Sequence, residues 1–103
     1  MILIYCPCKN KKEAKRIAES LIAKKLVACA NIVGSDSLYV WKGKLCCEKE
    51  AILLLKTAGS NKEKVNKEIK KLHSYDLPAI ININCRSNKL FEDWVIKQTW
   101  QNR

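Results

Sequence analysis

The segments Val27–Trp41, VACANIVGSDSLYVW, and Lys44–Thr57, KLCCEKEAILLLKT, are joined only by Lys42 and Gly43 and predict one long β-hairpin. Each arm would reach roughly 45–50 Å at about 3.3 Å per residue. A compact domain of about 100 residues has a radius of gyration of only about 13 Å. We therefore expect the hairpin to bend at Gly34 and to project beyond its own sheet. The alternative is that residues 34–36 are a plain loop between two short strands.

Strand and helix patterns alternate on both sides of this hairpin. Apolar runs predict strands at residues 2–7, closed by Pro7, and at residues 79–85, opened by Pro78. Helices are expected after Asn10, after Ser60 and after Asn88. Asn10 with Glu13, and Ser60 with Glu63, have the spacing of capping boxes. Apolar residues at helical spacing follow each start: Ala14, Ile17, Ala18, Leu21 and Ile22; Val65, Ile69 and Leu72; Phe91, Trp94 and Val95.

The order of these elements is βαββαβ with an additional C-terminal helix. Two such split βαβ units form a ferredoxin-like sandwich, an α+β fold in which two helices cover one face of a four-stranded antiparallel sheet. We expect a single domain over residues 1–103, because no linker or low-complexity segment interrupts the pattern. A projecting hairpin tipped with Tyr39 and Trp41 leaves unpaired strand edges, which favours an oligomer.

The chain is basic, with 20 Lys and Arg against 10 Asp and Glu, a formal net charge of +10. This charge keeps nucleic acid among the partners to consider. However, Lys outnumbers Arg by 17 to 3, and the lysines cluster on the solvent faces of the expected helices. RNA-recognition modules of this topology stack bases on aromatic side chains of the central strands, whereas residues 50–56, EAILLLK, contain none. Nucleic acid is therefore not expected to bind.

Neither membrane insertion nor secretion is indicated. No apolar run approaches the roughly 20 residues that span a bilayer, and the start MILIY lacks the basic region of a signal peptide. We expect a cytoplasmic location and hence six reduced cysteines. Cys46 and Cys47 are adjacent, which is poor geometry for a disulfide. Enzymatic catalysis is not expected, because the chain has one histidine, three glycines and no G-x-S-x-G motif.

Several motifs in order along the chain resemble the divalent-cation tolerance family, CutA. They are residues 28–32, ACANI; residues 37–44, SLYVWKGK; Glu48, Glu50 and Lys56-Thr57; residues 73–80, HSYDLPAI; and residues 91–94, FEDW. The resemblance implies a ferredoxin-like, PII-like homotrimer in which long hairpin strands pair between subunits. It also implies a non-enzymatic role in tolerance of copper and other divalent ions, without an obligatory cofactor.

The resemblance carries over a metal site at Cys6 and His73. Thiolate favours Cu(I), and imidazole suits Cu(II) and Zn(II). Leu72 replaces a neighbouring histidine of some family members, which removes one imidazole and is expected to weaken Cu(II) binding. Cys8 is the nearest further thiol. The structural alternative is that Cys6 fills the core and that His73 is a polar residue favoured at a helix end.

A second group of residues could line a cleft between subunits for a small anion or a partner: Cys29, Tyr39, Trp41, Glu50, Lys56 and Tyr75. In the alternative interpretation, Tyr39 and Trp41 anchor an oligomer interface and Glu50 pairs with Lys56. The leading hypothesis is a trimer that binds copper or another divalent ion. A PII-like signalling or scaffold trimer is the alternative, and an RNA-binding module is less favoured.

Overall fold

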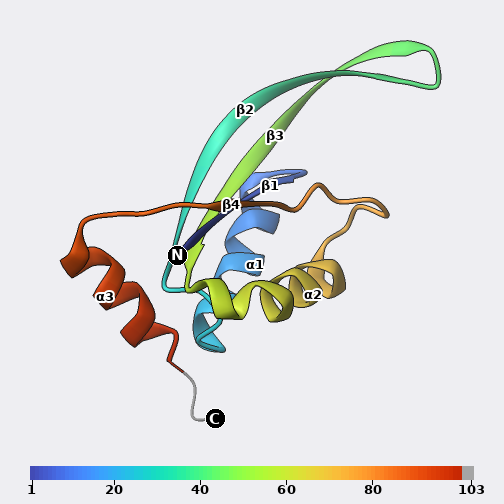
Figure 1. Ribbon diagram of the computed structural model, residues 1–103. Helices are drawn as coiled ribbons and strands as arrows, with labels where there is room; N and C mark the ends of the chain where they lie inside the picture. The colour runs from blue at the N-terminus through green and yellow to red at the C-terminus, as the bar shows by residue number, and fades with distance from the viewer. Residues whose placement is uncertain (101–103) are drawn as a thin grey trace.

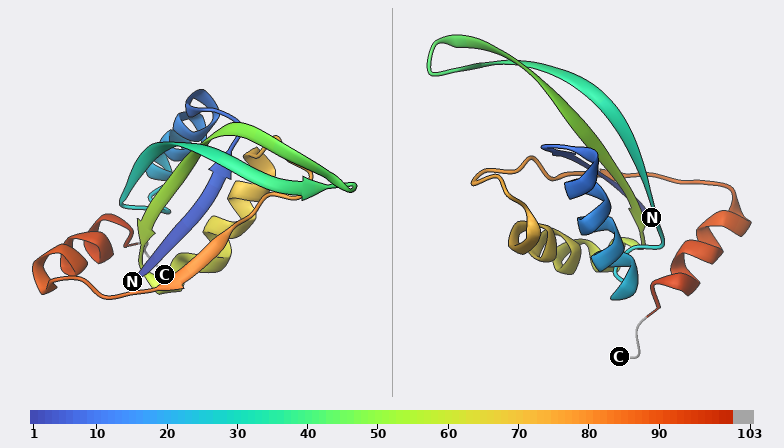
Figure 2. Two further views of the ribbon diagram at one scale, coloured as in Figure 1. Left: turned by 90° about the horizontal axis from the view of Figure 1, so that it is seen from above. Right: turned by 180° about the vertical axis from the view of Figure 1, so that it is seen from behind.

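Figure 1 shows the computed structural model, which describes residues 1–100. The elements are β1 (Ile2–Cys8), α1 (Lys11–Ala23), β2 (Cys29–Trp41), β3 (Lys44–Thr57), a 3-10 turn (Gly59–Asn61), α2 (Lys62–Leu72), β4 (Ile81–Asn84) and α3 (Lys89–Gln98). The four strands form one sheet in the order β2-β3-β1-β4, and every pairing is antiparallel. Helices α1 and α2 lie together on one face of this sheet (Figures 1 and 2). The ferredoxin-like α+β prediction is confirmed.

The core lies between the sheet and these two helices. Side chains along a strand point alternately to its two faces, and in β1 the residues at even positions are buried from Ile2 to Cys8. They pack with inward-facing residues of β3 and with the apolar stripes of the two helices: Leu53, Leu55, Ile17, Leu21, Val65 and Ile69. Ile22, expected in the first stripe, is 44% exposed at its border.

The hairpin is continuous from end to end. Its register runs unbroken from Cys29 opposite Lys56 to Trp41 opposite Lys44, with Gly34 paired to Ala51. The plain-loop alternative at residues 34–36 is therefore wrong. The hairpin curves as it rises beyond the rest of the sheet (Figure 1), and the molecule extends 47 Å along its longest axis. Lys42 and Gly43 both have positive φ, as a tight two-residue hairpin turn requires.

Several expected element ends differ from those observed. Helix α2 begins at Lys62 with Asn61, rather than Ser60, at its N-cap, and Ser60 lies within the 3-10 turn. The last strand covers residues 81–84 rather than 79–85. Strand β1 continues through Pro7 to Cys8. It can do so because β4 pairs only with residues 2–5, so no strand on that side requires the N–H that Pro7 lacks.

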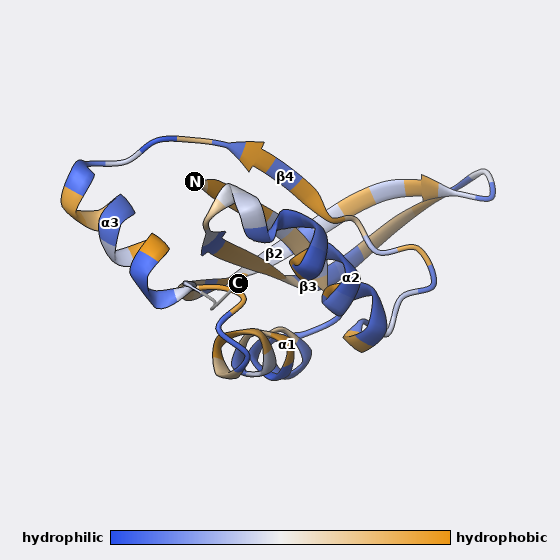
Figure 3. Ribbon diagram, turned by 60° about the horizontal axis from the view of Figure 1, so that its bottom comes forward, coloured by the Kyte–Doolittle hydropathy of each residue, from blue (hydrophilic) through white to orange (hydrophobic). Residues whose placement is uncertain are grey.

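Helix α3 begins after Asn88, as expected, and packs at the far end of the sheet from the hairpin tip (Figure 2). Val95 is fully buried, whereas Trp94 and Trp100 are 41% and 66% exposed. Leu90 and Ile96 of α3 are also exposed, by 81% and 44%, and apolar positions of this helix are orange in Figure 3. Among residues 1–100, no helix combines the length and hydrophobicity needed to cross a membrane.

Candidate metal centre

Two thiols point into the core from the end of β1. Cys6 and Cys8 are two residues apart, so the strand directs both side chains to the face that the helices cover. Both cysteines are fully buried. Their sulfur contacts to the backbone are long: 3.6 Å from Cys8 Sγ to the Cys6 oxygen, and 3.9 Å from Cys6 Sγ to the Pro7 oxygen. All six cysteines of the chain are free thiols, as expected.

His73 follows the last residue of α2 and faces the same end of β1. Its backbone N–H donates to Ile69 oxygen at 2.9 Å and so closes the helix. Its Nε2 lies 2.9 Å from the carbonyl oxygen of Pro7, and its Nδ1 lies 3.1 Å from the backbone nitrogen of Tyr75. Because a carbonyl only accepts and a backbone N–H only donates, Nε2 carries the proton and Nδ1 is the acceptor. The ring is a neutral imidazole with both nitrogens occupied.

These three side chains form a cluster. The sulfur atoms of Cys6 and Cys8 and a ring nitrogen of His73 all lie within 4.8 Å of one another. The structure therefore brings together Cys6 and His73, the two residues singled out in the sequence, and adds Cys8 from the same chain. Leu72 is partly buried against the core.

Glu13 holds the two segments that bear the cluster. Its side chain is only 3% exposed, and its two carboxylate oxygens accept the backbone N–H groups of Lys9 and Ser74, each at 3.0 Å. Lys9 directly follows Cys8, and Ser74 directly follows His73. The sequence indicated only a capping box, in which the Glu13 carboxylate would accept the backbone N–H of Asn10. The carboxylate instead accepts the N–H of the preceding residue, Lys9. The one hint of this role in the sequence is that the acidic Glu13 directly precedes Ala14, the first residue of the apolar stripe of the helix.

The electrostatic surroundings differ between these groups. Burial alone would raise the pKa of Glu13, but the hydrogen bonds from Ser74 and Lys9 outweigh it and hold the pKa below its usual range. The neighbouring Cys8 thiol lowers the pKa of Cys6, and the Cys6 thiol, together with burial, raises the pKa of Cys8. The donor set of two thiols and an imidazole suits soft and borderline metal ions.

The second group of predicted residues does not form one site within the chain. Strand register and alternation place five of the six on the sheet face opposite α1 and α2: Cys29, Tyr39, Trp41, Glu50 and Lys56. They are spread along the hairpin from base to tip. The expected pair of Glu50 with Lys56 is wrong. Tyr75 donates its hydroxyl to Glu50 at 2.6 Å, and Lys56 donates to the side chain of Asn31 at 2.7 Å.

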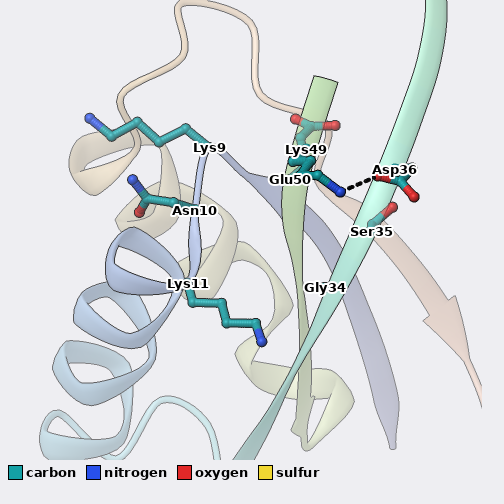
Figure 4. A pocket seen from close by; sticks show the side chains of 8 residues that line it. All are labelled: Lys9, Asn10, Lys11, Gly34, Ser35, Asp36, Lys49 and Glu50. Atoms are coloured by element: carbon teal, nitrogen blue, oxygen red, sulfur yellow. Dashed lines mark hydrogen bonds and ion pairs between the residues drawn. The ribbon is translucent and has the colours of Figure 1, made fainter. Parts of the chain in front are cut away.

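A hollow of about 420 Å³ lies between the start of α1 and the hairpin. Figure 4 shows the side chains that line it: Lys9, Asn10, Lys11, Gly34, Ser35, Asp36, Lys49 and Glu50. Lys49 is paired with Asp36 at 3.1 Å. This hollow was not predicted from the sequence, because its two walls are far apart in the chain.

Fold and site together define an α+β, PII-like protein with a buried cluster of two thiols and an imidazole. The chain belongs to the CutA1 divalent ion tolerance protein family, whose model matches residues 2–98. This membership places it among non-enzymatic tolerance proteins.

Three relatives illustrate the match. The divalent-cation tolerance protein CutA of Pyrococcus horikoshii is 35% identical over 100 residues, which cover 96% of this chain and 98% of that protein. The chloroplastic CutA 1 protein of Oryza sativa subsp. japonica is 36% identical over 95% of this chain, but only 56% of the rice protein is covered. The solved structure of the PII-like protein CutA from Nostoc sp. PCC 7120 in apo form has a TM-score of 0.91 and 30% identity, and the match covers 97% of this chain and 98% of that one.

Proposed function

We propose that the protein is a homotrimer that binds copper or another divalent metal ion at Cys6 and His73, without an obligatory cofactor, and acts in metal tolerance. The observation that carries this proposal is the convergence of three ligand-type side chains, from β1 and from the end of α2, within 4.8 Å. Thiolate and imidazole are the side chains that copper and zinc select. A cytoplasmic location stays a prediction, since the rice relative is described as chloroplastic.

Ligation by His73 requires a change in its hydrogen bonds. Both ring nitrogens are occupied, so one bond, to Pro7 or to Tyr75, must be exchanged for the metal. The freed backbone group then needs water or another partner, since a buried unsatisfied group costs about 1–3 kcal/mol. We therefore expect divalent binding to be weak and to depend on His73.

Self-association is supported by the hairpin. β2 is an edge strand of the sheet, so half of its backbone groups have no strand partner within the chain. Apolar side chains near the tip are exposed: Leu38 by 65%, Val40 by 68%, Trp41 by 59% and Leu45 by 72%. Such an edge pairs with a strand of another copy. Light scattering is expected to give three times the chain mass of 11.8 kDa; a monomer would contradict this part of the proposal.

Metal binding is tested by competition titrations of reduced protein with Cu(I) and Cu(II), run beside Cys6→Ser and His73→Ala. Binding that is lost in these variants is the expected result. Binding that is indifferent to both changes, or no binding, would contradict the proposed site. Circular dichroism of each variant verifies that the fold is retained.

A PII-like ligand function is the second candidate, and the lysine-lined hollow beside α1 favours it. Lys11 extends its ammonium group towards Gly34 across an opening large enough for a small anion, whereas Lys49 is paired with Asp36 and Lys9 extends away from the opening (Figure 4). A thermal-shift screen against nucleotides and organic acids tests this candidate, because a true ligand raises stability as its concentration increases. If no anion raised the melting temperature, the PII-like ligand function would be contradicted.

A further inference from the structure

We propose that the cluster holds Cu(I) between the sulfur atoms of Cys6 and Cys8, while His73 keeps its hydrogen bonds and acts as a positioning residue. This inference rests on the proposed function in one respect, that the cluster is a metal site. It goes further by assigning a soft monovalent ion, a second thiol as ligand and a different role for the histidine. Only a divalent ion would then require the imidazole.

The separation of the two thiols fits one ion. Their sulfur atoms are at most 4.8 Å apart. Metal–sulfur bonds are about 2.3 Å long, so two of them laid end to end span about 4.6 Å. A separation within the 4.8 Å limit therefore lets both sulfur atoms bind one ion between them, and thiolates are ligands that Cu(I) favours. Both thiol protons leave to solvent as the two copper–sulfur bonds form, and no electron is transferred.

The thiols and the imidazole differ in the hydrogen bonds that each must give up to bind a metal ion. The sulfur contacts, at 3.6 and 3.9 Å, are long and are lost at little cost. His73 has bonds of 2.9 and 3.1 Å to backbone groups at both nitrogens. Recruiting His73 would leave a backbone group of Pro7 or Tyr75 without its partner. Cu(I) needs no such exchange, because the two sulfur atoms already supply its ligands.

The ligand count also disfavours a divalent ion at this place. Structural Zn(II) sites normally have four protein ligands, and this cluster offers three at most among residues 1–100. Glu13 is a nearby carboxylate, but both its oxygens accept backbone N–H groups, and Glu50 accepts the hydroxyl of Tyr75. Glu13 instead fixes the backbone beside Cys8 and beside His73. The full burial of both cysteines excludes water, which protects Cu(I) from oxidation.

The experiment is a competition titration of the reduced, full-length protein with Cu(I) against the chelator bicinchoninate. Cys8→Ala is compared with Cys85→Ala, a matched loss of a thiol outside the cluster, and with His73→Gln. We expect Cys8→Ala to lower Cu(I) affinity by about 100-fold or more, His73→Gln by less than about tenfold, and Cys85→Ala not to change it. X-ray absorption of copper-loaded wild-type protein should count two sulfur ligands, and this readout needs no variant.

Other outcomes separate this inference from the proposed function. Unchanged Cu(I) affinity in Cys8→Ala, a larger loss in His73→Gln than in Cys8→Ala, or one sulfur per copper would overturn the inference. If divalent binding still needed Cys6 and His73 in that case, the proposed function would stand. Conversely, Cu(I) binding that needs Cys8, with no divalent binding at all, would support the inference and overturn the divalent part of the proposed function.

Discussion

His73 donates a hydrogen bond of 2.9 Å from Nε2 to the carbonyl oxygen of Pro7, which lies 66 positions earlier in the chain. Pro7 has no β4 residue beside it, because β4 pairs only with residues 2–5 of β1. Its carbonyl therefore needs a partner from elsewhere, and the imidazole at the end of α2 supplies one. This bond joins the two segments that carry the candidate metal ligands.

Removing this imidazole should destabilise the fold even without metal. His73→Ala leaves the partly buried carbonyl of Pro7 without its donor, so we expect a loss of about 1 kcal/mol in the free energy of unfolding. His73→Gln retains an N–H donor and should recover part of this loss. Urea unfolding at one fixed protein concentration measures both. A His73→Ala variant as stable as the wild type would show that the bond contributes nothing.

Replacing Glu13 should destabilise the fold in a manner that depends on pH. The folded-state pKa of Glu13 is lowered, so its contribution is full above the unfolded pKa of about 4.3 and is lost as pH falls through the folded pKa. We expect Glu13→Gln to cost about 1–3 kcal/mol at neutral pH, with the difference from wild type shrinking below about pH 4.

The matched control on the same helix is Glu19→Gln, since the side chain of Glu19 is 66% exposed and its ion pair with Lys15 is long at 4.0 Å. Exposed pairs of this kind contribute about 0–1 kcal/mol. Unfolding curves from pH 3 to pH 7 compare the two variants. Equal effects of Glu13→Gln and Glu19→Gln would contradict the role assigned to Glu13.

Two substitutions in the hairpin turn should change the melting temperature in opposite directions. Gly43 has φ of +76°, so Gly43→Ala places a Cβ in the left-handed region and should cost about 1 kcal/mol. Lys42 has φ of +51°, where Asn is better accommodated, so Lys42→Asn should raise the melting temperature. Gly59→Ala is the control, because an added Cβ meets nothing within 4 Å there. Thermal unfolding that ranks the three variants otherwise would refute this interpretation.

The contact between Tyr75 and Glu50 should be visible in alkaline titration. Burial first, and then the hydrogen bond to Glu50, raise the pKa of Tyr75 above its usual value. Glu50→Gln removes the negative charge and should lower the pKa of Tyr75, which ultraviolet absorbance at high pH measures. Tyr75→Phe identifies which part of the titration belongs to this residue. No change in Glu50→Gln would mean that the contact does not form in solution.

Periodicity accounts for the part of this structure that the sequence predicted well. Alternation in residues 2–8 and helical spacing in residues 14–21 identify the buried faces, and the order of elements then leads to the sheet topology. That topology brings the end of β1 close to the end of α2, and so Cys6 close to His73. The long hairpin followed from two uninterrupted β-forming segments around a two-residue turn.

Individual polar contacts could not be predicted in this way. The bonds of Glu13 to Lys9 and Ser74 depend on a loop whose course is set by the packing of α2, which the local pattern at residues 10–13 does not encode. Tyr75 and Glu50 are likewise 25 positions apart and meet only in the folded chain. The expected pair of Glu50 with Lys56 failed because six residues of strand separate the two side chains by about 20 Å.

The most direct test of the metal site is the amount of copper that stays bound after reduced protein is loaded with Cu(I) and dialysed without air. Elemental analysis should find one copper ion per chain in the wild type and close to none in Cys6→Ser, whose circular dichroism should match that of the wild type. No copper retained by the wild type, or the same amount retained by Cys6→Ser, would contradict the proposal that this cluster is a metal site.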